Sequence, residues 1–437
     1  MKKFFIVFLF GIFCFSNIFG KKESNNRFTA CIAGSLSNHE FEYGNEGYAG
    51  AFSGICGRKL VFAGGTNYSE EKPWEGGTKI FYDKVYVYDI LKDSLIDTEN
   101  LYRLPYAVAY GASVTLPDGI LCIGGNNSEV CFPNVFLMTW DEKYNQIQFV
   151  DFPDLPVALS YTSATVIGEN VYVAGGTFSV TGVDTGSHFF KLDLSKRDSE
   201  DFSWETLASF PGMGRIFPVI AAQSNGYAPC IYLFSGRNVN ENREISIHRD
   251  GLVYNTDSNT WSTIEMDGTF DFPVVGGSAF SNKKNEIIIV GGSSGELLLK
   301  EQYDRSQFHD VVKMRSSDSI LKYKEDRIRY YTDHPGFSKD ILIFNTVEKT
   351  LIKGGLFDSL CPIMTTAIPY KKGAIMVSGE SKPGVRSRNI YWIRPVSGQN
   401  SFLSSNLKII VLSVLLFGTV GFLFLYRHKR KSLRRED

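Results

Sequence analysis

One pattern constrains this chain more than any other: a short apolar strand that ends in glycine and recurs along the sequence. Four copies end in a glycine pair and two keep a single glycine: KLVFAGG (59–65), ILCIGG (120–125), VYVAGG (171–176), IIIVGG (287–292), IYLFSG (231–236) and AIMVSG (374–379). The copies are mostly 51 to 60 residues apart. A period of that length predicts a repeat architecture in which each unit is one small sheet.

Each unit holds more than its glycine-ended strand. A strand of small residues precedes it, as in YGASVTLP, and a strand with alternating aromatic residues follows it, as in KVYVYDI. Four short strands per unit predict an all-β fold, a six-bladed β-propeller, in which small residues suit the crowded inner strand. The last unit lacks a fourth strand after Pro395, and we expect RFTACIAGSL (27–36) to supply it and close the ring.

The fifth unit carries an insert of nearly fifty residues between Gly292 and Ile341. The insert is rich in charge and in helix formers and shows no strand alternation. We therefore expect a helical insert in the fifth blade, over one mouth of the propeller, where it forms a lid or a wall. An insert without regular structure is the alternative.

Both ends of the chain predict targeting to a membrane. Two lysines and an apolar run indicate a signal peptide over 1–20. The 18 uncharged residues of 409–426 are long enough for one C-terminal transmembrane helix, with a buried core helix as the alternative. The basic tail, 427–437, is expected in the cytoplasm. The propeller (28–396) and a linker (397–408) are then extracytoplasmic, in a membrane-anchored, single-pass protein.

Charge and motif content exclude several functions. The formal net charge is −1, but the part expected outside carries about −8 because the tail holds many of the cations, so nucleic acid is not an expected partner. The six histidines are scattered and no metal-binding spacing or phosphate-binding glycine loop is present, so we expect no metal and no organic cofactor. Cys122 and Cys131 are close enough in sequence to form a disulfide, but buried free thiols are equally compatible with the pattern.

Longer motifs carry a resemblance to a known family. They are GYAGAFSGICGRKLVFAGGTNY (47–68), PWEGGTK (73–79), AYGASVTLPDGILCIGG (109–125) and GESKPGVR (379–386). Over roughly 28–396 the chain resembles the cyclically permuted mutarotases, the kelch-repeat family of N-acetylneuraminate epimerase. This resemblance implies a secreted isomerase that interconverts the α and β anomers of sialic acid. It also implies that Glu380 is the proton acceptor.

The residues around Glu380 fit this chemistry. Opening a cyclic hemiketal needs a base for the anomeric hydroxyl and an acid for the ring oxygen. Cations near Glu380 favour its ionised form, as a base requires. A planar guanidinium is the natural partner for the carboxylate of sialic acid, and Arg386 is the first candidate, Arg215 the second and Arg237 the third. A surface or inter-blade salt bridge is the alternative for each arginine.

Four further residues are candidates for substrate binding. Asn67, Lys79 and Asn126 follow glycine-ended strands and are placed to bind sugar hydroxyls or the N-acetyl group, although turn formation explains the asparagines equally well. Tyr110 opens an inner strand and either faces the central funnel or packs between blades. Two other functions stay open: a membrane-tethered propeller that binds a glycan or protein without catalysis, and a mutarotase for another sugar. The anchor also raises the expectation of a functional link to a sialic acid transporter.

Overall fold

The structure, a computed structural model, describes residues 26–36, 47–69, 71–92, 94–95, 102–265, 273–313 and 317–396. The chain divides into two compact units, 1–394 and 395–437, and the second lies almost wholly outside the described ranges. The predicted signal peptide, linker, transmembrane helix and cytoplasmic tail likewise lie outside them. None of the helices within the described ranges is long and apolar enough to cross a membrane.

The fold is all-β and propeller-like, built from short antiparallel strands. Four sheets contain four strands each. In chain order these strands are β2 (Phe52–Cys56), β3 (Lys59–Ala63), β6 (Val85–Asp89) and β7 (Ser94–Leu95); β8 (Ala112–Leu116), β9 (Gly119–Ile123), β10 (Val135–Asp141) and β11 (Gln146–Phe152); β12 (Ser163–Ile167), β13 (Asn170–Ala174), β14 (Phe189–Asp193) and β15 (Trp204–Thr206); β16 (Val219–Ser224), β17 (Pro229–Phe234), β20 (Gly251–Asn255) and β21 (Thr260–Thr263). A 3-10 turn, η1 (Leu194–Lys196), follows β14.

The fifth and sixth repeats share one eight-stranded sheet. The expectation of six separate blades is therefore wrong, and four separate four-stranded blades are found. The order of this sheet is β22 (Ser278–Ser281), β23 (Glu286–Val290), β24 (Asp340–Asn345), β25 (Thr350–Phe357), β1 (Phe28–Ser35), β30 (Asn389–Pro395), β27 (Gly373–Val377) and β26 (Ile368–Tyr370). The N-terminal strand β1 lies next to β30, as the sequence predicts. It also pairs in parallel with Gly355–Phe357 of β25, and this second pairing merges the two repeats.

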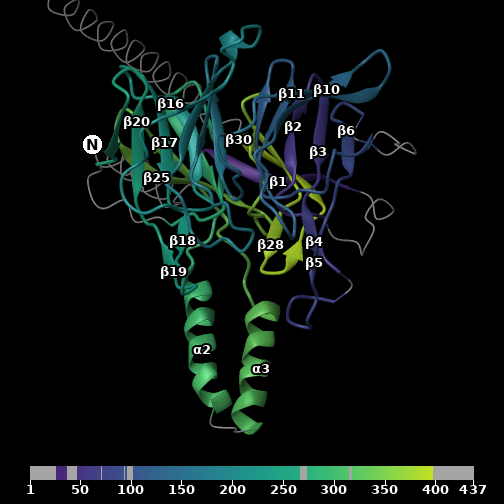
Figure 1. The fold of residues 1–437 in the computed structure, drawn as a ribbon, viewed down its shortest axis with the longest axis vertical. Helices are drawn as coiled ribbons and strands as arrows, with labels where there is room; N and C mark the ends of the chain where they lie inside the picture. Colours follow the sequence, from purple (N-terminus) through teal and green to yellow (C-terminus); the bar gives the residue numbers. More distant parts are fainter. Residues whose placement is uncertain are drawn as a thin grey trace, which may run out of the picture. The chain divides into compact units, whose positions relative to one another are not determined.

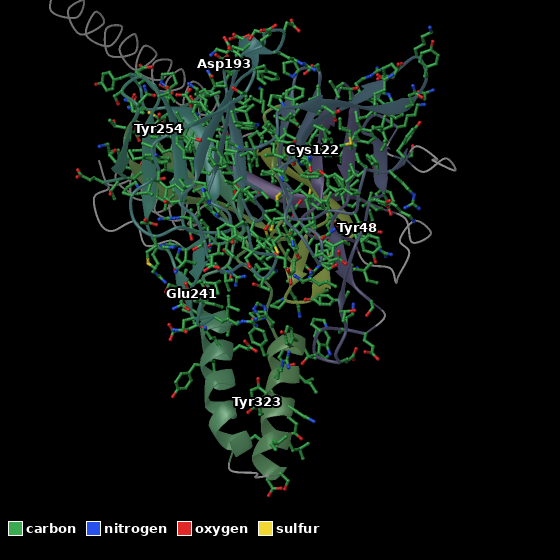
Figure 2. The ribbon with its side chains drawn as sticks, viewed as in Figure 1. Tyr48, Cys122, Asp193, Glu241, Tyr254 and Tyr323 are labelled. Carbon is green, nitrogen blue, oxygen red and sulfur yellow. The ribbon has the colours of Figure 1, made fainter. Side chains whose placement is uncertain are left out.

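The core lies between neighbouring repeats. The glycine-ended strands β3, β9, β23 and β27 are buried along their whole length, because side chains of adjacent repeats cover both of their faces. Six clusters of buried side chains each join two neighbouring repeats. Tyr48, Cys122 and Tyr254 lie in this interior (Figure 2). Cys122 and Cys131 are free thiols, so the disulfide that the sequence left open is not formed.

Backbone hydrogen bonds close the repeats into a ring. Six residues, one from each repeat, form this ring and are called the ring members below. Each donates its backbone N–H to the carbonyl of the ring member before it, over 2.7 to 3.0 Å. The donor and acceptor pairs are Tyr110 to Gly50, Tyr161 to Tyr110, Phe217 to Tyr161, Gly276 to Phe217, Met364 to Gly276 and Gly50 to Met364. All six residues have positive φ, between 54° and 69°.

A second set of six residues repeats one backbone contact. In every repeat, the residue that follows the glycine-ended strand exchanges two backbone hydrogen bonds with the residue before the ring member. These residues, called the bridge positions below, are Thr66, Asn126, Thr177, Arg237, Ser293 and Glu380. The same local structure therefore holds all six at the same place in their repeats.

Three short hairpins and two helices lie at the same end of the sheets (Figure 1). The hairpins are β4 (Thr66–Tyr68) with β5 (Lys79–Phe81), β18 (Arg237–Val239) with β19 (Ile245–Ile247), and β28 (Glu380–Lys382) with β29 (Val385–Arg386). The helices α2 (Glu296–Lys313) and α3 (Ser317–Thr332) form the insert between β23 and β24, so the helical prediction is confirmed and the unstructured alternative is wrong. The insert contacts β18–β19, since Gln302 Nε2 donates to the Arg243 carbonyl over 2.7 Å.

Candidate active site

Glu380 begins β28 directly after the glycine-ended strand of the last repeat. The chain turns there because Ser378 and Gly379 both have positive φ, 59° and 101°. Ile363 and Glu380 then exchange two backbone hydrogen bonds of 2.9 Å. The backbone of Glu380 is therefore held from both sides, and the residue is only 9% exposed.

The carboxylate of Glu380 has two polar contacts within its own hairpin. Oε1 accepts a hydrogen bond of 2.7 Å from the backbone N–H of Gly384 and lies 3.0 Å from Arg386 Nη1. Glu380 and Arg386 stand opposite each other in the register of β28 and β29, so the turn at Pro383 and Gly384 brings the guanidinium to the carboxylate. The two side chains are 11% and 1% exposed, which makes this a buried ion pair.

Arg386 is enclosed by groups that favour its charge. Its Nε donates to the Thr66 carbonyl over 3.5 Å, and its Cζ lies 5.1 Å from the centre of the Tyr68 ring. Burial acts to lower the pKa of Arg386, but the nearby Glu380 carboxylate and, more weakly, two tyrosines outweigh it and raise the pKa. The guanidinium is therefore a permanent cation, and its charge is directed at Glu380.

Three aromatic ring members pack together beside this pair and are called the aromatic trio below. The ring centres of Tyr110 and Tyr161 are 4.8 Å apart, and those of Tyr161 and Phe217 are 5.0 Å apart. Lys79 Nζ donates to the Tyr110 hydroxyl over 3.2 Å. Burial raises the pKa of Tyr110 to about 12, against the opposing effect of Arg386, so its hydroxyl keeps its proton at neutral pH. The trio also lines a central cavity of about 120 Å³ between the inner strands.

Arg237 extends from the first residue of β18 over the aromatic trio. Its Cζ lies 5.5 Å from the centre of the Phe217 ring, and its Nε is buried with no hydrogen-bond partner among the described residues. Burial lowers the pKa of Arg237, although Tyr161 and Glu380 oppose this shift. Lys79, Arg237 and Arg386 thus give the site a cationic character around the Glu380 carboxylate, which suits an anionic ligand.

The helical insert contributes to the rim of the site. Tyr331, at the end of α3, stacks on Trp74 with ring centres 5.2 Å apart. Burial raises the pKa of Tyr330, and the charge of Glu380 adds to this, whereas Arg237 opposes it. Tyr330 is therefore close enough to Glu380 and Arg237 for the charge of each to act on its hydroxyl. The insert therefore contacts the loop of the first repeat through Trp74.

Two of the residues predicted to bind substrate direct their polar groups elsewhere. Arg215 is 1% exposed, and its guanidinium pairs with both carboxylate oxygens of Asp250 over 2.7 and 3.1 Å. It also donates to the Ser235 carbonyl over 3.0 Å, so it joins neighbouring segments of its own repeat. Asn67 lies within β4; it donates to the Gly47 carbonyl over 3.0 Å and accepts from the Tyr68 N–H over 2.8 Å.

The other predicted residues lie at the site, together with several that sequence reasoning missed. Glu380, Arg386, Arg237, Lys79 and Tyr110 are brought together, and Asn126 adds a buried Oδ1 that has no partner among the described residues. The missed residues are Tyr68, Tyr161, Phe217 and Tyr330. A usable signal existed for Tyr161 and Phe217, because they occupy the same place in their repeats as Tyr110. The described residues contain no cluster of three or more histidine, cysteine, aspartate or glutamate side chains arranged to hold a metal.

Comparison with known proteins relates this geometry to one family. The family model for N-acetylneuraminate epimerase matches residues 152–400, which is more than half of the chain. A protein from Haemophilus influenzae (strain PittEE) named N-acetylneuraminate epimerase is 26% identical over 239 residues, covering 54% of this chain and 57% of that protein. One of the same name from Yersinia enterocolitica is 24% identical over 247 residues, covering 55% and 56%. The chain thus matches little more than half the length of these relatives.

A solved structure agrees on the fold. The structure of YjhT aligns with a TM-score of 0.50 and 14% sequence identity, and the alignment covers 78% of this chain and 94% of that one. At this identity the likeness concerns the fold alone. Taken with the match over 152–400, the conclusion is that the chain belongs to the N-acetylneuraminate epimerase family.

Proposed function

We propose that this protein is a mutarotase that interconverts the α and β anomers of N-acetylneuraminate. The observation that carries the proposal is the buried carboxylate of Glu380, held by the Gly384 N–H and by Arg386 beside an aromatic and cationic surface. The names of the matched relatives support the same reaction class. A fixed carboxylate and a neutral hydroxyl near each other are the groups that an acid–base ring opening needs.

The reaction breaks the bond between the anomeric carbon and the ring oxygen and forms it again on the other face. Glu380 accepts the proton of the anomeric hydroxyl, and the electrons of that O–H bond form a carbonyl. The electron pair of the ring C–O bond stays with the ring oxygen, which takes a proton. We assign this proton to Tyr110, whose hydroxyl is buried and accepts a hydrogen bond from Lys79. Reclosure on the opposite face returns both protons, so no cofactor is consumed.

The arrangement of Arg386 gives it a positioning role. The ion pair of 3.0 Å, together with the Gly384 N–H, fixes the position of one carboxylate oxygen of Glu380 within the hairpin. The second oxygen, Oε2, makes no such contact with the described residues, and we assign it as the atom that meets the substrate. Loss of either partner leaves a buried charge without compensation.

Anomer-resolved proton NMR tests the proposal. The α anomer is released from a glycoside by a sialidase, and the purified protein is added while the β anomer is still scarce. The wild type should speed the approach to equilibrium, and Glu380→Gln should lower the rate by about 10²- to 10⁴-fold. Glu348→Gln, which changes an exposed carboxylate in the turn between β24 and β25, is the matched control. If the wild type binds sialic acid and leaves the rate unchanged, the non-catalytic binding propeller replaces the mutarotase.

The proposal also includes a cellular setting. The apolar segment and the basic tail that follows it support a single-pass anchor, with the propeller outside the cytoplasm and near a transporter for the sugar. Protease treatment of intact cells checks this, because an extracytoplasmic propeller is degraded while the tail is protected.

A further inference from the structure

The six bridge positions offer an internal comparison within the molecule. Four of them carry the neutral residues Thr66, Asn126, Thr177 and Ser293. The remaining two carry the only charges at these positions: Glu380 in the sixth repeat and Arg237 in the fourth. Both make the same pair of backbone hydrogen bonds, with Ile363 and Ile216 respectively. Arg237 therefore occupies the position in the fourth repeat that Glu380, the proposed base, occupies in the sixth.

Arg237 is a cation without a counterion. No aspartate or glutamate of the described residues lies within 4.0 Å of its guanidinium, which stands over the Phe217 ring instead. Its Nε is buried and makes no hydrogen bond there. A buried guanidinium N–H that makes no hydrogen bond is unfavourable, and a carboxylate that accepts two parallel hydrogen bonds, one of them from Nε, would satisfy it.

Arg386 differs from Arg237 in having a counterion and a hydrogen bond from its Nε. Its guanidinium already faces the Glu380 carboxylate at 3.0 Å, and its side chain is 1% exposed. Its Nε is directed to the Thr66 carbonyl. A second carboxylate at Arg386 would compete with Glu380 and displace the proposed base from its position.

We infer that Arg237, rather than Arg386, is the group that binds the carboxylate of the substrate. The ligand class is then a sugar acid whose carboxylate and anomeric hydroxyl are attached to the same carbon, so that Arg237 holds the carboxylate while Glu380 meets the hydroxyl. This inference rests on the proposed function, since it takes the anomeric centre to lie at Glu380. It makes Arg237 the residue that selects acidic over neutral sugars.

Binding of N-acetylneuraminate and of its methyl ester tests the inference. The ester keeps the anomeric hydroxyl and lacks the negative charge. In titration calorimetry the wild-type protein should bind the acid about 10- to 100-fold more tightly than the ester. Arg237→Gln should bind the two equally, whereas Arg386→Gln should keep the preference for the acid and lose catalytic rate. Arg58→Gln, at an exposed turn arginine, is the control and should match the wild type.

The outcomes separate the inference from the proposed function. Equal binding of acid and ester by the wild type overturns the inference, as does an undiminished preference in Arg237→Gln or a loss of preference in Arg386→Gln alone. Arg237→Lys keeps the charge without the planar fork and should retain part of the preference, which maintains the test if the glutamine variant does not fold. A wild type that prefers the acid through Arg237 without accelerating mutarotation supports the inference and refutes the mutarotase.

Discussion

Replacing Gly384 with alanine tests the link between the turn and the carboxylate. Gly384 has a φ of +77°, and an alanine in this left-handed region costs about 1–2 kcal/mol. The new Cβ would also lie 2.6 Å from Pro73 Cγ and 3.2 Å from a Trp74 ring carbon, closer than the 3.4 Å at which ordinary contact begins. The hairpin must therefore move away from the loop of the first repeat.

That movement weakens the hydrogen bond from the Gly384 N–H to Glu380 Oε1, now 2.7 Å long. A hydrogen bond to a charged group contributes about 1.5–3 kcal/mol. If the bond supports the ionised base through the transition state, its loss lowers kcat by about 10- to 150-fold. The unfolding free energy should fall by the backbone cost of about 1–2 kcal/mol, together with the cost of the displaced contact.

The matched control is Gly212→Ala. Gly212 has a φ of +87° and no neighbouring atom within 4 Å of its added Cβ, so this variant carries the backbone cost alone. Anomer-resolved NMR gives the rate, and urea unfolding gives the stability. If the two variants have the same kcat and differ only in stability, the turn does not position Glu380 and the reasoning is refuted.

Three further predictions concern other contacts. Arg215→Met should lower the unfolding free energy in urea by about 2–3 kcal/mol, because it leaves the partly exposed Asp250 without its ion-pair partner. KM should be unchanged, and a higher KM with unchanged stability would show that Arg215 binds substrate. Tyr110→Phe should lower kcat by about 10- to 100-fold at constant KM, and an unchanged kcat would remove it as proton donor. Burial, and then Lys382, lower the pKa of His334, so its contribution to stability is present above about pH 6.5 and is lost as the pH falls below that value. His334→Gln should flatten the unfolding free energy between pH 7 and 5, and an unchanged slope would contradict this.

The sequence was sufficient for the repeat and for the strand that closes it. Glycine-ended strands are local features, and each predicted copy forms a buried second strand of its repeat. The count of separate sheets was wrong, because it depends on three residues of β1 that pair with Gly355–Phe357. This parallel contact joins segments more than three hundred residues apart, and nothing in either segment indicates it.

The same distinction between local features and long-range contacts applies to the site. Glu380 and Arg386 are six residues apart across one turn, so the sequence placed them together correctly. The pairing of Arg215 with Asp250 spans 35 residues, and the sequence offers no means to see that its guanidinium is already occupied. Arg237 ranked third for the opposite reason: the absence of a partner is a property of the folded surroundings.

The asymmetry of the closed ring explains where the site lies. All six ring members adopt positive φ, a conformation that costs most residues about 1–2 kcal/mol, yet Tyr110, Tyr161 and Phe217 occupy three consecutive positions. Gly50 is the ring member that precedes Tyr110. A Cβ at Gly50 would lie 2.5 Å from a carbon of the Tyr110 ring, so the glycine makes room for the aromatic side chain. Bulky aromatic groups thus occupy three consecutive positions of the ring, and two of the other three positions are glycines. Strained residues of this kind concentrate at functional sites, and here they provide an aromatic surface beside the Glu380–Arg386 pair.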